Sequence, residues 1–208
     1  MPTKITTFIV TYNRPDLLKR TLDSLKGVYM GDHLVVIVNE INSQTQDVLD
    51  RYDFIDDVIA SKKNRGSCWA INVGVEVAKF NNSDFVNYMQ DDVVVKDGNF
   101  LNILLDIWEN SKLNLGAISG YDYKITTETN RSYKEVTEII EWKGHKLKVR
   151  GVLQGQNIFM PLKNWKEYFP ISYIDIDGKP RGYPTKGRGA DLDWWICLHS
   201  PNSINKKG

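Results

Sequence analysis

Residues 85–94 of the 208-residue chain read Phe85-Val86-Asn87-Tyr88-Met89-Gln90-Asp91-Asp92-Val93-Val94. The first half of this stretch is typical of a buried strand, and it runs directly into two adjacent carboxylates. Such a pair at the end of a core strand is unfavourable unless something binds it. Mg²⁺ or Mn²⁺ takes oxygen ligands of this kind and often shares them with substrate phosphates. The alternative is a tight turn between strands, where Asp is common, and the stretch alone does not decide between the two.

The first 120 residues alternate between strand patterns and helix patterns. Strands are indicated by runs of β-branched and aromatic residues, and helices by apolar residues recurring every three or four positions. The expected strands cover 4–12, 34–38, 58–60, 85–89 and 115–119, and the expected helices cover 15–25, 44–52, 67–79 and 100–110. Apolar strands that alternate with helices indicate an α/β fold with a mostly parallel sheet covered on both faces.

Polar residues follow three of the expected strands. They are Tyr12-Asn13, Asn39-Glu40 and Asp91-Asp92. Because ligands of parallel sheets bind at the carboxyl ends of the strands, we expect these three pairs to form one site.

The pattern changes after residue 120. Loosely alternating apolar residues over 132–152 predict an antiparallel hairpin that turns near Lys143-Gly144-His145, and 156–160 is expected to add one strand. Residues 175–189, rich in Gly, Pro, Lys and Arg, predict a loop, and 191–199 predicts a helix. We expect one domain in which the later half builds the other wall of a pocket.

Composition excludes several functional classes. The 27 basic and 26 acidic side chains leave a net charge of +1, which argues against a nucleic-acid partner bound through backbone charge. Cys68 and Cys197 have no metal-like spacing, so we expect reduced thiols. No apolar run is long enough to be a transmembrane segment, and the polar start does not resemble a signal peptide. The sequence thus predicts a cytoplasmic protein, or one held peripherally at a membrane through a partner.

Four motifs carry a resemblance that extends over nearly the whole chain, to GT-A-fold glycosyltransferases of family 2. Phe8–Arg14 resembles the first strand and nucleotide-binding Tyr-Asn turn of that family. Asn64–Gly74 is similar to its Asn-x-Gly segment and the helix that follows. Gln90-Asp91-Asp92 stands at the Asp-x-Asp metal motif, and Gly189–Trp194 resembles the segment that supplies the catalytic base.

This resemblance implies a fold and an activity. The fold is a Rossmann-like, mostly parallel sheet flanked by helices, with a smaller antiparallel portion on the acceptor side. Residues 1–208 would form a single domain, with 1–120 as the nucleotide-sugar-binding half and 121–208 as the acceptor-side half. The activity is that of a metal-dependent, inverting glycosyltransferase using Mn²⁺ or Mg²⁺. It would move a sugar from a nucleotide-diphosphate sugar, in the first place a UDP-sugar, to a glycan, glycoprotein or lipid-linked acceptor.

The resemblance also implies roles for individual residues. Asp191 would be the general base and Asp92 the metal ligand, with Asp91 as a second candidate ligand and His199 as a weaker one. The residues expected to contact the nucleotide sugar are Thr11, Tyr12, Asn13, Arg14, Asn39, Glu40, Asn64, Arg65, Gly66, Asn72, Gln90 and Asp91. Those expected in the acceptor or sugar pocket are Gln154, Asn157, Asp193, Trp194 and Trp195.

Structural explanations remain open for several of these residues. Asp193 is also a good cap for a helix N-terminus, Gln154 suits a polar turn, and at least one of Trp194 and Trp195 suits a protein core. Gln90 replaces the first acid of the metal motif, and Asn39 stands where the family often has Asp. A catalytically inactive nucleotide-sugar-binding module is therefore one alternative function. A nucleotidyltransferase is another, although the sequence after the first strand lacks the Gly-rich, basic loop usual in that class.

Overall fold

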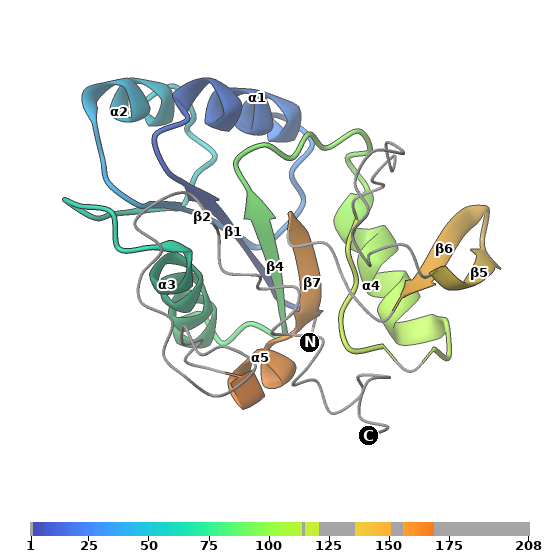
Figure 1. Ribbon diagram of the computed structural model, residues 1–208. Helices are drawn as coiled ribbons and strands as arrows, with labels where there is room; N and C mark the ends of the chain where they lie inside the picture. Colours follow the sequence, from blue (N-terminus) through green and yellow to red (C-terminus); the bar gives the residue numbers. More distant parts are fainter. Residues whose placement is uncertain (1, 114, 121–135, 151–155, 169–208) are drawn as a thin grey trace.

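The computed structural model describes residues 2–113, 115–120, 136–150 and 156–168 (Figure 1). The elements in chain order are β1 (Ile5–Thr11), α1 (Pro15–Leu25), β2 (His33–Val38), α2 (Ser43–Leu49), β3 (Asp57–Ala60), α3 (Ser67–Phe80), β4 (Phe85–Gln90), α4 (Phe100–Asn110), β5 (Val136–Trp142), β6 (His145–Arg150), β7 (Asn157–Pro161) and α5 (Leu162–Tyr168).

Five strands form a central sheet in the order β3-β2-β1-β4-β7. The pairs β1–β2, β1–β4 and β2–β3 are parallel, and β7 is antiparallel to β4. β5 and β6 form a separate two-stranded antiparallel sheet. The predicted α/β fold with a mostly parallel sheet and a smaller antiparallel portion is therefore confirmed.

Helices cover both faces of the central sheet (Figure 1). Side chains alternate between the two faces along a strand, so Phe8 packs in the core beneath α3 and α5, whereas Ile9 packs in the core beneath α1 and α2. Gly74 of α3 lies directly against the Phe8 ring, and a Cβ atom at this position would overlap the ring. The absence of a side chain at Gly74 thus lets α3 approach β1 closely.

Most of the predicted elements are confirmed, with two differences. The strand expected at 115–119 is wrong: Ile118 makes only an isolated antiparallel bridge to Phe159, with both hydrogen bonds at 2.8 Å. α5 was not predicted, although Leu162 and Trp165 are one helical turn apart and both are buried. The expected loop 175–189 and helix 191–199 lie outside the described residues. Within the described part of the chain, no helix combines the length and hydropathy needed to cross a membrane.

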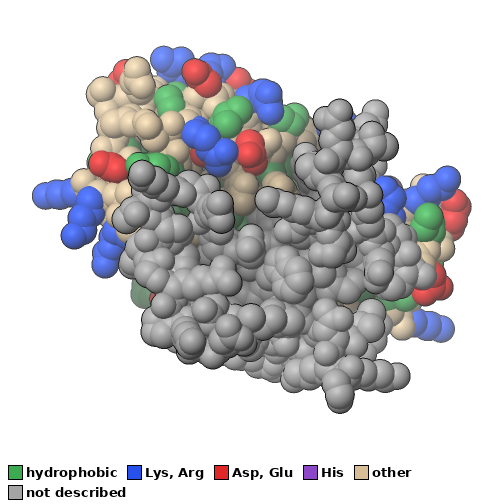
Figure 2. Space-filling view, in the orientation of Figure 1, with side chains coloured by type: hydrophobic (Ala, Val, Ile, Leu, Met, Phe, Trp, Pro, Cys, Tyr) green, Lys and Arg blue, Asp and Glu red, His purple; other side chains and the backbone are tan. Residues whose placement is uncertain are grey.

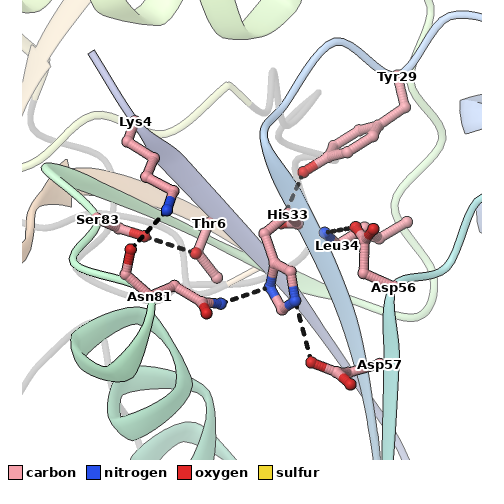
Figure 3. A network of polar contacts seen from close by, with 9 residues as sticks. All are labelled: Lys4, Thr6, Tyr29, His33, Leu34, Asp56, Asp57, Asn81 and Ser83. Atoms are coloured by element: carbon pink, nitrogen blue, oxygen red, sulfur yellow. Dashed lines mark hydrogen bonds and ion pairs between the residues drawn. The ribbon is translucent and has the colours of Figure 1, made fainter. Parts of the chain in front are cut away.

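The amino ends of the strands are fastened together by polar side chains (Figure 3). His33, at the start of β2, contacts Asp57 Oδ2 through Nε2 at 3.0 Å and Asn81 Nδ2 through Nδ1 at 3.0 Å. Asn81 also accepts a hydrogen bond from Lys4 Nζ at its backbone oxygen, at 2.7 Å. These contacts tie β1, β2, β3 and the end of α3 to one another, so this edge has a structural role.

The β5–β6 hairpin turns at Lys143-Gly144, where both residues have positive φ (46° and 83°), as a two-residue type I′ turn requires. The hairpin is attached to α4 through Asp106, whose carboxylate accepts hydrogen bonds from Trp142 Nε1 at 3.0 Å and Lys143 Nζ at 2.8 Å. The hydrogen bonds from Lys143 and Trp142 lower the pKa of Asp106. The contact between Asp106 and the hairpin should therefore be fully formed at pH values above the ordinary pKa of Asp. It should weaken as the pH falls through the lowered pKa of Asp106.

We predict that Asp106→Asn loosens the hairpin without unfolding the domain. The substitution removes the ion pair to Lys143, and a solvent-exposed pair of this kind contributes little to global stability. Hydrogen exchange of the amides of 136–150 should become several-fold faster, whereas the exchange of β1 and β4 should not change. Glu109→Gln, an exposed acid on the same helix, is the matched control. Unchanged exchange in the hairpin of Asp106→Asn would contradict the assignment of Asp106 as its anchor.

Candidate functional site

Three neighbouring parallel strands place their carboxyl ends side by side. β1 ends at Thr11, and Asn39 directly follows β2. The backbone N–H of Asn39 donates a hydrogen bond to the backbone oxygen of Thr11 at 2.8 Å. Asn13 and Glu40 have positive φ (50° and 91°), so the chain turns sharply after both strands. Tyr12 remains 43% exposed. The expected convergence of residues 12–13, 39–40 and 91–92 on one edge of the sheet is therefore what the structure shows.

Asp91 is completely buried at the end of β4. Its Oδ2 accepts a hydrogen bond from Thr11 Oγ1 at 2.6 Å, and its Oδ1 forms an ion pair with Arg14 Nη2. Its backbone oxygen accepts from Thr21 Oγ1 at 2.8 Å. Burial raises the pKa of the Asp91 carboxyl above its ordinary value, although the Thr11 hydroxyl and the Arg14 guanidinium act in the opposite direction. Asp91 is therefore fixed in position by two strands and a helix.

Asp92 is the more accessible of the two acids, with its side chain 33% exposed. Its Oδ2 lies 3.3 Å from Arg14 Nη1, and its buried Oδ1 has no hydrogen-bond partner among the described residues. A carboxylate oxygen left in this state is suited to a hard divalent cation. The described residues contain no group of three or more His, Cys, Asp or Glu side chains that would complete a cation site. Oxygens from a bound diphosphate or from water would then supply the other ligands.

The Asn39 side chain fixes the loop between β3 and α3. Its Oδ1 accepts from the Arg65 backbone N–H at 2.6 Å, and its Nδ2 donates to Asn64 Oδ1 at 2.9 Å. Asn64 Oδ1 also accepts from the Gly66 N–H at 2.8 Å. Gly66 has a φ of 83° and immediately precedes α3, a conformation for which glycine is favoured. Asn39 is almost completely buried, and its side-chain amide uses one donor and one acceptor in this loop. Its expected contact with the nucleotide stays a prediction.

This loop also carries positive charge. Figure 2 shows Lys and Arg side chains gathered at the side of the molecule where Figure 1 draws the loop. Lys62, Lys63 and Arg65 are all exposed, and the Arg65 guanidinium lies 5.0 Å from the centre of the Trp69 ring. The cations border the edge where the sequence predicts a diphosphate.

The remaining expected site residues differ in their positions. Gln90 is half-buried at the end of β4, where its N–H donates to the Gln156 oxygen at 2.8 Å, and Asn72 is half-buried in α3. Asn157 is buried, and its amide contacts Asn87 Oδ1 at 2.7 Å, the Tyr88 oxygen at 2.9 Å and the Gly120 N–H at 3.0 Å. These contacts give Asn157 a structural role in the sheet, and its expected contact with a sugar stays a prediction. The other expected residues, Gln154, Asp191, Asp193, Trp194, Trp195 and His199, lie outside the described residues.

Thr21 is a site residue that the sequence did not reveal. It lies on the buried face of α1 with Leu18, Leu22 and Leu25, and from there it reaches the backbone of Asp91. The available signal was a hydroxyl within an otherwise apolar helical stripe, because a buried polar group requires a partner.

Comparisons with known proteins give the family and the fold of the chain. The family model described as glycosyl transferase family 2 matches residues 6–163. The chain belongs to glycosyl transferase family 2. No curated protein sequence matches it.

The fold of this family 2 chain is similar to that of S. aureus TarS 1–349, with a TM-score of 0.60 at 14% identity over 97% of this chain and 55% of that one. This similarity shows the GT-A fold. A mannosyltransferase from Pyrobaculum calidifontis, solved with GDP-Man and Mn²⁺, is 18% identical with a TM-score of 0.48, over 57% of this chain and 35% of that one. A Mycobacterium tuberculosis glucosyl-3-phosphoglycerate synthase, solved with Mn²⁺, UDP and glucosyl-3-phosphoglycerate, is 13% identical with a TM-score of 0.45, over 55% and 42%. The chain spans about half or less of the length of these three solved structures.

We predict that Asn39→Asp, which restores the acid often present in this family, destabilises this chain. One carboxylate oxygen would still accept from the Arg65 N–H, but the other would face Asn64 Oδ1, an acceptor that Gly66 holds in place. A buried acceptor without a donor costs about 1–3 kcal/mol, and urea unfolding at pH 7 measures the loss.

The matched control is Asn42→Asp. Asn42 caps α2 by accepting from the Thr45 N–H at 2.8 Å, and Asp caps a helix as well as Asn does. Its Nδ2 also donates to Asn13 Oδ1 at 3.3 Å, but this contact is exposed, so water can replace it. The effect of Asn42→Asp should therefore stay within about 0.5 kcal/mol. If Asn39→Asp proves as stable as the unsubstituted protein, Asn39 does not have the structural role described here.

Proposed function

We propose that this chain is a metal-dependent, inverting glycosyltransferase that transfers a sugar from a nucleotide-diphosphate sugar to an acceptor hydroxyl. The observation that carries the proposal is the carboxylate pair Asp91-Asp92 at the end of β4, beside the ends of β1 and β2, in a chain of glycosyl transferase family 2. Ligands of parallel sheets bind at this edge. The choice of a UDP-sugar as donor rests on the sequence resemblance.

In this proposal, different residues at the carboxyl edge of the sheet contact different parts of the nucleotide sugar. Tyr12, which is exposed, offers a ring face to the nucleobase, and Asn13 and Glu40 lie beside it at the turns. Asp92 would hold a divalent cation, which when bound would neutralise the negative charge that develops on the leaving diphosphate. Asp91 is buried and held by Thr11, so it would position Asp92 and the ribose side of the donor without moving.

The acceptor hydroxyl must lose its proton as the new bond to the sugar forms. We assign this step to Asp191, on the basis of the segment Gly189–Trp194. A general base typically contributes a factor of 10²–10⁴ to the rate. Trp194 and Trp195 would offer aromatic faces to the sugar rings, and Asp193 would orient the segment.

An inactive nucleotide-sugar-binding module is the second candidate function. Gln90 in place of the first acid of the metal motif favours it, since the site then has less negative charge for a cation. This candidate predicts nucleotide binding with no transfer or hydrolysis of any donor in the presence of any divalent metal.

Nucleotide binding should depend on Asp92 and on metal. We expect calorimetry with UDP, GDP, CDP and dTDP to show a preference for one of them, UDP first, in the presence of Mn²⁺, and a loss of affinity with excess chelator. Asp92→Asn should weaken binding with Mn²⁺ by at least about tenfold, or about 1.4 kcal/mol, and chelator should then have little further effect. Asp53→Asn, at an exposed acid away from this edge, is the control. If Asp92→Asn binds the nucleotide with Mn²⁺ as tightly as the unsubstituted protein does, Asp92 is not a metal ligand.

The general base is tested by turnover together with binding. Asp191→Asn should lower transfer by about 10²–10⁴-fold and leave nucleotide affinity unchanged, because the donor site is built from other residues. Asp193→Asn should lose less activity, since residues two apart on the expected helix do not face the same side. Normal turnover by Asp191→Asn would refute its role as the base.

A further inference from the structure

Arg14 bridges the two carboxylates of the candidate metal site. Its Nη2 forms an ion pair with Asp91 Oδ1, and its Nη1 lies 3.3 Å from Asp92 Oδ2. The Arg14 side chain is 42% exposed, whereas Asp91 is completely buried. The guanidinium therefore lies on the solvent side of the buried acid, where a ligand would approach.

The backbone positions Arg14 for this contact. Asn13 turns the chain with a positive φ directly after β1, and Pro15 begins α1, so Arg14 stands at the junction of strand and helix. Thr11 and Thr21, from the same strand and helix, hold Asp91 from the other sides. The arrangement is thus built from consecutive elements and does not depend on a long surface loop.

A guanidinium and a divalent cation compete for the charge of this carboxylate pair. The planar fork of Arg matches two carboxylate oxygens and keeps its charge at any working pH. A cation at the unpartnered Oδ1 of Asp92 would face the positive charge of Arg14 at short range. A cation that also used Oδ2 would have to displace Nη1. A displaced guanidinium needs another anion, and the phosphates of a bound nucleotide would supply one.

We propose that Arg14 is a built-in counter-ion that keeps divalent metal off the carboxylate pair until a nucleotide diphosphate arrives. The phosphate oxygens would accept hydrogen bonds from the released guanidinium, and the metal would bind the Asp92 carboxylate. Metal and nucleotide would then bind with positive coupling, and Arg14 would position the diphosphate. This inference rests on the proposed function, because it requires a diphosphate at this edge of the sheet.

The test is a titration with Mn²⁺ alone, in which the electron paramagnetic resonance signal of free Mn²⁺ measures how much is bound. We expect Arg14→Gln to bind Mn²⁺ at least about tenfold more tightly than the unsubstituted protein, because the competing charge is gone. Arg20→Gln, at an exposed position on α1, the helix that follows Arg14, should leave the affinity unchanged. UDP, with its own complex with Mn²⁺ taken into account, should tighten Mn²⁺ binding by a larger factor in the unsubstituted protein than in Arg14→Gln.

A second variant covers the case in which Arg14→Gln does not fold, since it leaves a buried carboxylate without its partner. Arg14→Lys keeps the charge but presents a single ammonium, which does not match two carboxylates in the way the fork does. Its affinity for Mn²⁺ should lie between those of the unsubstituted protein and Arg14→Gln. Thermal unfolding with and without Mn²⁺ gives an independent reading, with a larger upward shift in either variant than in the unsubstituted protein.

The inference and the proposed function fail in different ways. If neither folded variant binds Mn²⁺ more tightly than the unsubstituted protein, the counter-ion role of Arg14 is wrong, even where UDP still binds. If the variants do bind Mn²⁺ more tightly but no nucleotide binds to any form of the protein, the competition stands, and both the coupling and the proposed function are wrong.

Discussion

The parallel pairing of β1 with both β2 and β4 is the constraint on which the rest of the site depends. It brings three strand ends to one edge, and Thr11 joins them: its backbone oxygen accepts from Asn39 after β2, and its hydroxyl donates to Asp91 after β4. A shift of one residue in either pairing would turn the side chains that follow to the opposite faces. The positions of Asp91, Asp92 and Asn39 relative to one another are therefore set by the sheet and not by the loops.

The same edge of the sheet holds two adjacent carboxylates, one of which is fully buried. A fully buried carboxylate is tolerated only with partners, and Asp91 has a hydroxyl, a guanidinium and a fixed backbone around it. Asp92, next in the chain, retains an oxygen without a partner among the described residues. The fold thus uses one acid for structure and leaves the other available for a ligand, whereas the polar contacts around His33 tie the amino edge together.

The sequence predicted the part of this arrangement that depends on local patterns. Apolar runs such as 34–38 and 85–89 predict the parallel strands, and the polar residues that follow them predict which edge of the sheet carries the candidate site. What it did not predict depends on tertiary contacts. Residues 115–119 read as a strand, but Ile118 finds only one partner at Phe159. The sequence did not reveal that the Asn157 amide bridges β4 and Gly120. No spacing rule reveals that Arg14 reaches acids 77 and 78 residues away in the chain.

The central claim is that Asp92 holds a divalent cation at this edge and that Arg14 gives way to it. Anomalous diffraction at a wavelength that excites manganese, from crystals grown with Mn²⁺ and UDP, tests both parts in one experiment. The account predicts a manganese peak within coordination distance of the Asp92 carboxylate, with the Arg14 guanidinium withdrawn from the acids and directed at the diphosphate. A peak away from Asp92, or a bound metal with Arg14 still bridging both carboxylates, would contradict it.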